Sequence, residues 1–111
     1  MAAVAQAAEI VAVGVLEQNP SKYSTCVGVS EDGQWVVGNS RKMDSGLVLR
    51  DWPFYWSRTG GMQDMGNPSG GNSYVTGCAV LWNGGLLACG NVGGMARKWV
   101  GGAWSILPGQ G

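Results

Sequence analysis

Seven carboxylates are the side chains of this chain that could carry out acid–base chemistry. They are Glu9, Glu17, Glu31, Asp32, Asp44, Asp51 and Asp64. Two carboxyl groups held about 5 to 9.5 Å apart can hydrolyse a glycosidic bond. Glu31 and Asp32 are adjacent and fall in a predicted hairpin turn, where we expect both to be solvated. A hydrolase that uses Asp44, Asp51 or Asp64 is therefore only a third hypothesis, and we expect no enzyme and no catalytic residue.

Other kinds of catalytic or metal site have little support in the sequence. The chain has no histidine, which excludes histidine-dependent triads and histidine metal sites. Its three cysteines, Cys26, Cys78 and Cys89, form no C-x-x-C pair, so we expect no metal site. The glycines form no phosphate-binding motif, and we expect no cofactor. We expect the cysteines to be small buried side chains in strands, or alternatively one pair to form a disulfide.

Length and charge limit the class of protein. A chain of 111 residues predicts a single domain, 1–111. Seven basic and seven acidic residues give no net charge, which argues against a nucleic-acid partner. No apolar run reaches the roughly 18 residues of a membrane span. The alanine-rich stretch Met1–Glu9 lacks a positively charged start, so we do not expect a complete signal peptide there.

A repeat is the main feature of the organisation. Shifting residues 26–39 by 52 positions lays them over residues 78–91. The matched positions include Cys26 with Cys78, Gly33 with Gly85, and Gly38-Asn39 with Gly90-Asn91. Farther along, residues 54–62 match 97–103, and residues 14–24 resemble 66–74. The sequence therefore predicts two repeats, at about 17–66 and 67–108, preceded by a strand at 10–16.

Each repeat has the pattern of four short antiparallel strands. The turns contain Asp32-Gly33 and Gly60-Gly61 in the first repeat, and Asn83-Gly84-Gly85 and Gly101-Gly102 in the second. The predicted strands are 25–30, 35–39, 54–57 and 62–66, then 74–82, 86–91, 96–100 and 103–107. The predicted fold class is all-β, with two tandem four-stranded antiparallel units that resemble propeller blades.

Two such units cannot close a propeller by themselves. Propellers usually have four to eight blades, and two blades leave open edges and unburied faces. We therefore expect self-association into a homo-oligomer, with a dimer as the commonest symmetric outcome. The alternative is that the two units pack face to face as a two-sheet sandwich.

The largest difference between the repeats is an insertion, Arg41–Trp52, between the second and third strands of the first repeat. Insertions in repeats become surface loops, often on a binding face. A solvated loop or hairpin extension without a partner is the alternative. The candidate binding residues are Arg41, Lys42, Asp44, Arg50, Asp51, Trp52 and Trp82.

The six tryptophans differ in their expected roles. Trp56 and Trp99 occupy equivalent repeat positions and are predicted to lie in the core. Trp35 and Trp104 follow turns and are expected to be half-buried. Trp52 and Trp82, which have polar neighbours, are the candidates for exposed aromatic rings that bind a sugar or a protein.

The first repeat resembles a known family. Its segments Gly28–Ser40, Phe54-Tyr55-Trp56 and Gly60–Gly66 are similar to the bacterial extracellular HAF repeats, whereas the second repeat is a degraded copy. The resemblance covers about two thirds of the chain. It implies an all-β, propeller-like architecture and an exported or extracellular setting. The family has no defined catalytic residues, so none are carried over.

The sequence therefore favours a non-catalytic β-repeat module that recognises a protein or a glycan through its loops. The alternative function is that of a structural protein whose role is assembly without a ligand.

Overall fold

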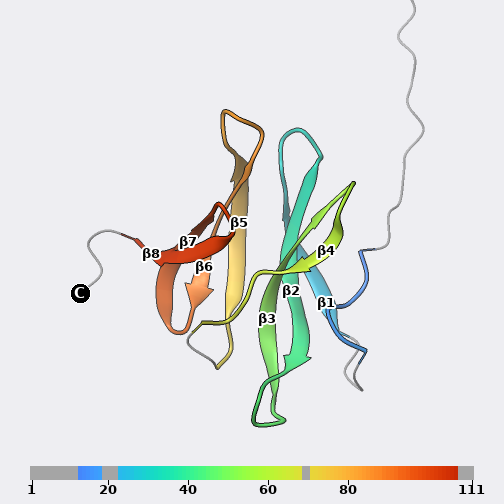
Figure 1. Cartoon of the computed structure of the whole chain (residues 1–111), viewed down its shortest axis with the longest axis vertical. Helices are drawn as coiled ribbons and strands as arrows, with labels where there is room; N and C mark the ends of the chain where they lie inside the picture. The colour runs from blue at the N-terminus through green and yellow to red at the C-terminus, as the bar shows by residue number, and fades with distance from the viewer. Residues whose placement is uncertain (1–12, 19–22, 69–70, 108–111) are drawn as a thin grey trace, which may run out of the picture.

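The chain consists of two four-stranded antiparallel sheets, which confirms the all-β prediction (Figure 1). The computed structural model describes residues 13–18, 23–68 and 71–107, and these contain no helix. Sheet 1 comprises β1 (Ser24–Val29), β2 (Trp35–Met43), β3 (Leu49–Ser57) and β4 (Gly61–Asp64). Sheet 2 comprises β5 (Tyr74–Val80), β6 (Leu86–Val92), β7 (Met95–Val100) and β8 (Ala103–Ile106). In both sheets the strands follow one another in chain order, and neither sheet closes into a barrel.

The first turn of each sheet is built in the same way. Gly33 and Gly84 both have positive φ, at 71° and 85°, which a residue with a Cβ rarely adopts. The preceding Asp32 and Asn83 each accept a hydrogen bond from the backbone amide two residues later, at 3.1 and 3.0 Å. The glycine equivalent to Gly33 is therefore Gly84. The match of Gly33 with Gly85, predicted from the shift of 52 residues, is wrong.

The insertion in the first repeat is a hairpin extension of the sheet. β2 and β3 remain paired from Trp35 opposite Ser57 as far as Met43 opposite Leu49. In Figure 1 this hairpin projects at the bottom, whereas the β1–β2 and β5–β6 turns lie at the top. Of the two structures considered for residues 41–52, the hairpin extension is the one observed.

A bulge at the same place in both sheets defines which positions are equivalent. The register of β1 on β2 shifts between Cys26 and Gly28, opposite Gly38. The register of β5 on β6 shifts between Val75 and Gly77, opposite Gly90. The spacing of 52 residues is therefore right for β2 and β6. It is wrong for β1 and β5, where equivalent residues differ by 49, and Cys26 is equivalent to Val75 rather than to Cys78.

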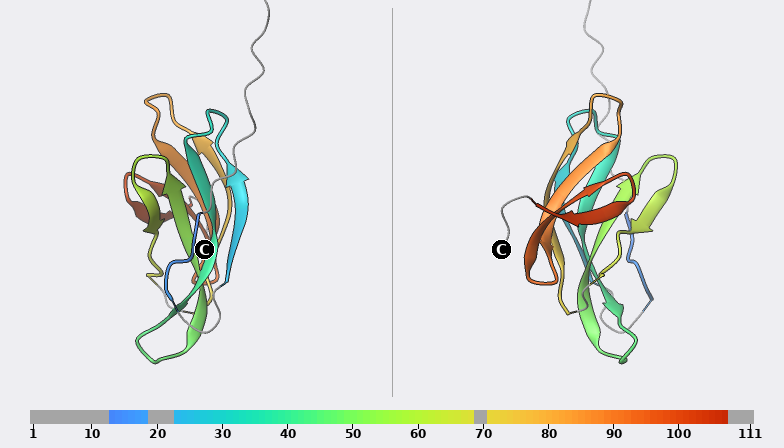
Figure 2. Two further views of the ribbon diagram at one scale, coloured as in Figure 1. Left: turned by 90° about the vertical axis from the view of Figure 1, so that its right-hand side faces the viewer. Right: turned by 60° about the vertical axis from the view of Figure 1, so that its left-hand side comes forward.

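Each sheet has an inner face, which packs against the other sheet, and an outer face. The inner face of sheet 1 includes Val37, and that of sheet 2 includes Ala88 and Trp99; these three belong to one hydrophobic core cluster, and the half-buried Trp35 and Tyr55 of sheet 1 pack against it. β5 contacts β1, β2 and β3, and all views place it beside sheet 1 (Figures 1 and 2). The core therefore lies between the sheets and depends on contacts between the two repeats.

The two inner faces are not equivalent to one another. Val37 pairs with Tyr55 on the inner face of sheet 1, and its register equivalent in sheet 2, Cys89, lies on the outer face. Ala88 lies on the inner face of sheet 2, and its equivalent in sheet 1, Val36, points outward. The two sheets thus pack face to face around one core, as in the two-sheet alternative, but through unlike faces, the front of one repeat against the back of the other.

One buried side chain ties the sheets together. Asn39 on β2 donates from Nδ2 to the carbonyl oxygen of Val75 at 3.2 Å and accepts from the Val75 amide at Oδ1 at 2.9 Å. Both bonds are buried. Because Val75 lies at the bulge of β5, this amide satisfies backbone groups that would otherwise be unpaired in the core.

The predicted N-terminal strand at 10–16 falls partly outside the described residues, which begin at residue 13. Residues 13–16 are not in a strand. The segment 13–18 is held at sheet 1 by bonds from the Leu16 amide to Ser40 Oγ, at 3.2 Å, and from the Met43 amide to Glu17 Oε1, at 3.1 Å. It therefore lies against sheet 1 as an irregular segment.

The cysteines and tryptophans show where burial differs from expectation. All three cysteines are in strands and are unpaired, but Cys26 and Cys89 are exposed, so the expectation that they are buried is wrong for these two. Trp99 is buried in the core as predicted, at 8% exposure. Trp56 is only half-buried and lies outside the core cluster, because its side chain is on the outer face of sheet 1.

Candidate functional site

The charged residues of the β2–β3 hairpin are paired with one another or with Asp64 on β4. The Asp64 carboxylate bonds the Lys42 ammonium and, at 2.6 Å, the Trp52 indole N–H. The Lys42 ammonium also lies 5.1 Å from the centre of the Trp52 ring. Trp52 is therefore half-buried under this cluster, and the prediction that it is exposed is wrong.

The other charges of the hairpin are matched in the same way. Arg41 lies 3.5 Å from Asp51, and the Tyr74 hydroxyl donates to Asp51 at 2.8 Å. That bond raises the pKa of Tyr74, because the hydroxyl is stabilised as a donor, and burial adds to the effect. Arg50 donates to Asp44 at 2.9 Å. The hairpin thus brings six of the seven predicted site residues together, but in contacts that hold the hairpin in shape.

Asp44 closes the tip of this hairpin. One carboxylate oxygen accepts from the amides of Gly46 and Val48, at 2.9 and 3.0 Å, and the other accepts from Arg50. The bond from the Val48 amide, followed by that from the Arg50 side chain, holds the pKa of Asp44 below its ordinary value. Both oxygens of Asp44 are therefore used to hold the turn, and the lowered pKa does not suit a general acid.

We expect the tip to lose these bonds in acid. A folded-state pKa below the unfolded one means that the stabilisation is present above the unfolded value and is lost as pH falls through the folded one. In an NMR pH titration, the Gly46 and Val48 amide shifts should share a midpoint below about 3.9, the ordinary value for aspartate. In the Asp44→Asn variant these shifts should not titrate. A midpoint at or above the ordinary value would contradict the assignment.

Trp82, the seventh predicted residue, is separated from the other six. It lies in the β5–β6 turn, at the end of the molecule opposite the β2–β3 hairpin (Figure 1). Its side chain is 97% exposed, which confirms the expectation for this residue. The predicted set is therefore not one site.

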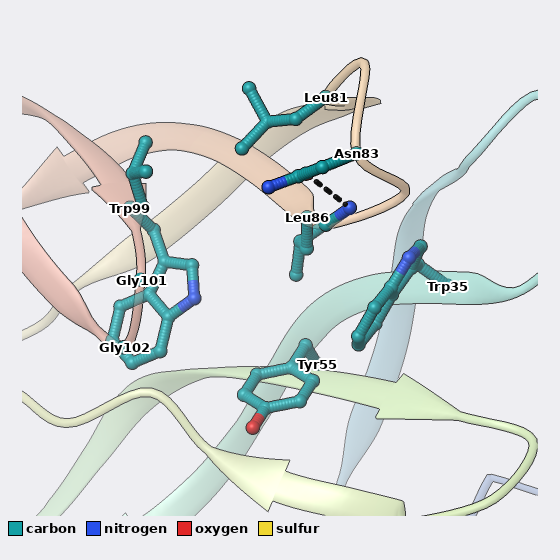
Figure 3. Close-up of a pocket in the computed structure, with 10 residues that line it drawn as sticks. Trp35, Tyr55, Leu81, Asn83, Leu86, Trp99, Gly101 and Gly102 are labelled. Carbon is teal, nitrogen blue, oxygen red and sulfur yellow. Dashed lines mark hydrogen bonds between the residues drawn. The ribbon is translucent and has the colours of Figure 1, made fainter.

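A cavity of about 280 Å³ lies beside this turn, between the two sheets. Figure 3 shows Trp35, Tyr55 and Trp99 around it, with Leu81 and Asn83 of the β5–β6 turn above. The remaining lining residues are Gly85, Leu86, Val100, Gly101 and Gly102. Leu81 and Asn83 are the immediate neighbours of Trp82, so the exposed indole and the cavity belong to the same end of the molecule.

The rings form a continuous row across the interface. Tyr55 lies 5.8 Å from Trp35 and 5.9 Å from Trp99, and Trp99 lies 5.6 Å from Trp104, all with tilted or edge-on geometry. Trp35 Nε1 donates to the carbonyl oxygen of Gly84 at 3.1 Å, which fastens the turn of sheet 2 to sheet 1. The row and this bond hold the cavity walls in place.

Sequence reasoning did not find this cavity. The rings of Trp35, Tyr55 and Trp99 were recognisable as strand residues, but they come from β2, β3 and β7. Only the stacking of the sheets brings them together. The alternation of side chains along β3 was a partial signal, because it places Tyr55 and its neighbour Trp56 on opposite faces of the sheet.

The groups that line this end are mostly apolar and aromatic. The cavity lining contains no carboxylate, and the described residues contain no group of three metal-binding side chains. Asn83 provides a side-chain amide over the cavity, with its oxygen already bonded to the Gly85 amide (Figure 3). Aromatic walls with one polar group suit the orientation of a small bound ligand.

Comparison of the chain with known protein families, with curated proteins and with solved structures finds no match. Among residues 13–18, 23–68 and 71–107, no helix has the length and apolar character needed to cross a membrane. The function of the chain therefore has to be inferred from its own geometry.

Proposed function

We propose that the chain is a non-catalytic binding module that recognises a glycan at the end of the molecule formed by Trp82 and the aromatic cavity. The observation that carries this proposal is the 97% exposure of the Trp82 indole. A large apolar ring left in water beside a ring-lined hollow is costly for solubility, and such surfaces commonly mark binding sites.

The chemistry of the site suits a sugar. The C–H face of a pyranose ring is apolar and flat and can stack on an indole, while its hydroxyl groups need hydrogen-bonding partners at the edge. Asn83, next to Trp82, provides an amide for such a bond. The cavity of about 280 Å³ is slightly smaller than most ligand sites, so we expect it to admit one sugar ring of a longer glycan.

The charged hairpin is less suited to ligand binding. Lys42, Asp44, Arg50 and Asp51 each have an opposite charge as a partner. A ligand would have to replace these contacts, and exposed ion pairs of this kind usually serve the local structure. We therefore place the binding site at Trp82 and not at the insertion.

We also propose that the chain is a two-unit member of the bacterial extracellular HAF-repeat type. Support comes from the sequence order of the first repeat and from the two blade-like sheets. An exported setting, where glycans are abundant, follows from that resemblance and agrees with the proposed ligand class.

Replacing Trp82 by alanine is expected to weaken glycan binding at least tenfold, as loss of a central aromatic contact does. The measurement is a glycan array, followed by titration of the best glycan while the tryptophan fluorescence is recorded. The fold should not change, because the side chain makes little contact with the rest of the chain.

Trp52→Ala is the matched control, since Trp52 lies at the opposite end. We expect it to retain the affinity of the unmodified chain. If Trp52→Ala loses binding while Trp82→Ala keeps it, the site is at the hairpin. If the folded chain binds no glycan on the array, the proposed function is wrong.

A further inference from the structure

The outer face of sheet 2 is largely apolar, with Lys98 and Asn91 among its exposed polar side chains, and none of the other described strands packs on it. It carries a shallow cavity of about 470 Å³, lined by Gly77, Cys78, Ala79, Leu87, Ala88, Cys89, Lys98 and Leu107. Ala79, Cys89 and Lys98 are exposed and Leu87 is half-buried. A surface of this kind is unusual on an isolated blade and needs a covering partner.

The interior of the molecule indicates what that partner is. By register, Cys89 is equivalent to Val37 and Lys98 is equivalent to Tyr55. Val37 and Tyr55 are covered by the inner face of sheet 2. The outer face of sheet 2 is therefore the equivalent of the inner face of sheet 1. In sheet 1 that face is covered by the following sheet, whereas in sheet 2 no described strand covers it.

We propose that the outer face of sheet 2 binds the outer face of sheet 1 of a second copy of the chain, repeating the interface between the two sheets. The outer face of sheet 1 is the register equivalent of the inner face of sheet 2, since Val36 corresponds to Ala88 and Trp56 to Trp99. The same chain thus carries both halves of one interface, one on each outer face.

One end of the outer face of sheet 1 has the surface that such contact requires, whereas Ser40 and Phe54 on the same face are already buried. Val29 is 62% exposed, and Val36, Trp56 and Met62 are half-buried. The segment 13–18 is attached at Ser40, which is paired with Ser24, whereas Val29 is at the other end of β1. The end of the face around Val29 is therefore open to a second copy.

Two specific contacts follow from the equivalence. Asn91 is the equivalent of Asn39 and is exposed, so its amide should bond the backbone of Cys26 in the second copy, as Asn39 bonds Val75. Lys98, the equivalent of Tyr55, should lie near the Trp56 ring of the second copy, because Tyr55 lies 5.9 Å from Trp99. An ammonium group over an indole is a favourable replacement for the ring pair.

The interface joins two different surfaces, so it is heterologous. Such interfaces build rings or open filaments, whereas a dimer with one shared patch would need two like surfaces. With two blades in each copy, closed rings of two, three or four copies would contain the four to eight blades of known propellers. A ring would also satisfy the exposed outer faces of all copies.

The test starts from the solution mass of the chain, measured by light scattering at about 100 µM. We expect two to four times the mass of one chain, and a monomer at this concentration would overturn the proposal.

Two variants block one face each. Cys89→Lys places a charge on the outer face of sheet 2, and Val29→Lys does so on the outer face of sheet 1. Each variant should be unable to close a ring. Thr59→Lys, in the β3–β4 turn, should assemble like the unmodified chain.

Mixing the two blocked variants distinguishes a heterologous interface from an isologous one. Every contact needs one outer face of sheet 1 and one outer face of sheet 2. Each variant alone has only one of the two unblocked, so it should be a monomer. The mixture retains one unblocked face of each kind and should form a one-to-one dimer. If Val29→Lys alone keeps the mass of the unmodified chain, or if the mixture stays monomeric, the interface is not the proposed one. Circular dichroism of each variant checks that the fold is intact, and glycan binding is not needed for any of these outcomes.

Discussion

Gly38→Ala is expected to disrupt sheet 1, at a cost of at least about 3 kcal/mol of unfolding free energy. A Cβ at this position would overlap the backbone carbonyl oxygen of Thr25 and would lie 2.8 Å from Phe54 Cζ. The carbonyl belongs to the paired strand at the bulge, so it cannot move away without breaking the register. Phe54 is fully buried and has no room to retreat. We expect the β1–β2 pairing to be lost before the rest of the sheet adapts.

The repeat provides an internal check on this prediction. Gly90 occupies the equivalent position in sheet 2, and a Cβ there would overlap the carbonyl oxygen of Tyr74 and lie 2.8 Å from the Val75 Cα. Gly90→Ala should therefore be about as damaging as Gly38→Ala. Urea unfolding, followed by circular dichroism at low protein concentration, measures both.

Gly77→Ala is the matched control, because it is also a strand glycine but its Cβ would meet nothing closer than Cys89 Sγ at 3.9 Å. Alanine costs less backbone entropy than glycine, so this change should be neutral or stabilise the chain by up to about 1 kcal/mol. If Gly77→Ala is as destabilising as the other two, the losses reflect a general intolerance of alanine and not the close approach at the bulge.

Trp99→Ala is expected to cost about 3 to 5 kcal/mol, as for other buried aromatic residues cut to alanine. Trp99 is 8% exposed and is the ring that joins Tyr55 of sheet 1 to Trp104 of sheet 2. Its removal takes away the ring contacts with Tyr55 and Trp104, which help to hold the two sheets together. For a small chain this is a large part of the total stability, so we expect the sheets to separate.

Thermal and urea unfolding of Trp99→Ala should be compared with those of Trp82→Ala. Trp82 is almost fully exposed, and its removal should change stability by less than about 0.5 kcal/mol. Trp99→Phe keeps a ring in the row and should recover a substantial part of the loss. Equal losses in Trp99→Ala and Trp82→Ala would show that the row of rings does not hold the sheets together.

The strands themselves could be predicted because their signals are local. Alternating apolar residues, β-branched and aromatic residues, and turns marked by Asp32-Gly33 or Gly101-Gly102 act within a few residues of the chain. All eight observed strands overlap the predicted ones. A hairpin extension at 41–52 was one of the two structures expected there, and the structure shows that β2 and β3 continue their ladder through it.

The candidate site was predicted only in part: Trp82 was recognised, whereas the pairing of the hairpin charges was not. Lys42, Asp64 and Trp52 are far enough apart in sequence that their contacts depend on the register of three strands. A charged residue looks available for a ligand until its partner across the sheet is known. Trp82 could be recognised, since a turn residue with polar neighbours has little chance of being covered.

What the sequence determined by itself is the set of strands, the turns and the duplication of one unit. The tertiary structure alone decided which side of each strand is covered. Trp56 and Trp99 occupy the same register position, yet Trp99 is in the core and Trp56 is not. The reason is that the sheets stack front to back, so equivalent faces have different neighbours, and no residue near Trp56 in the chain carries that information.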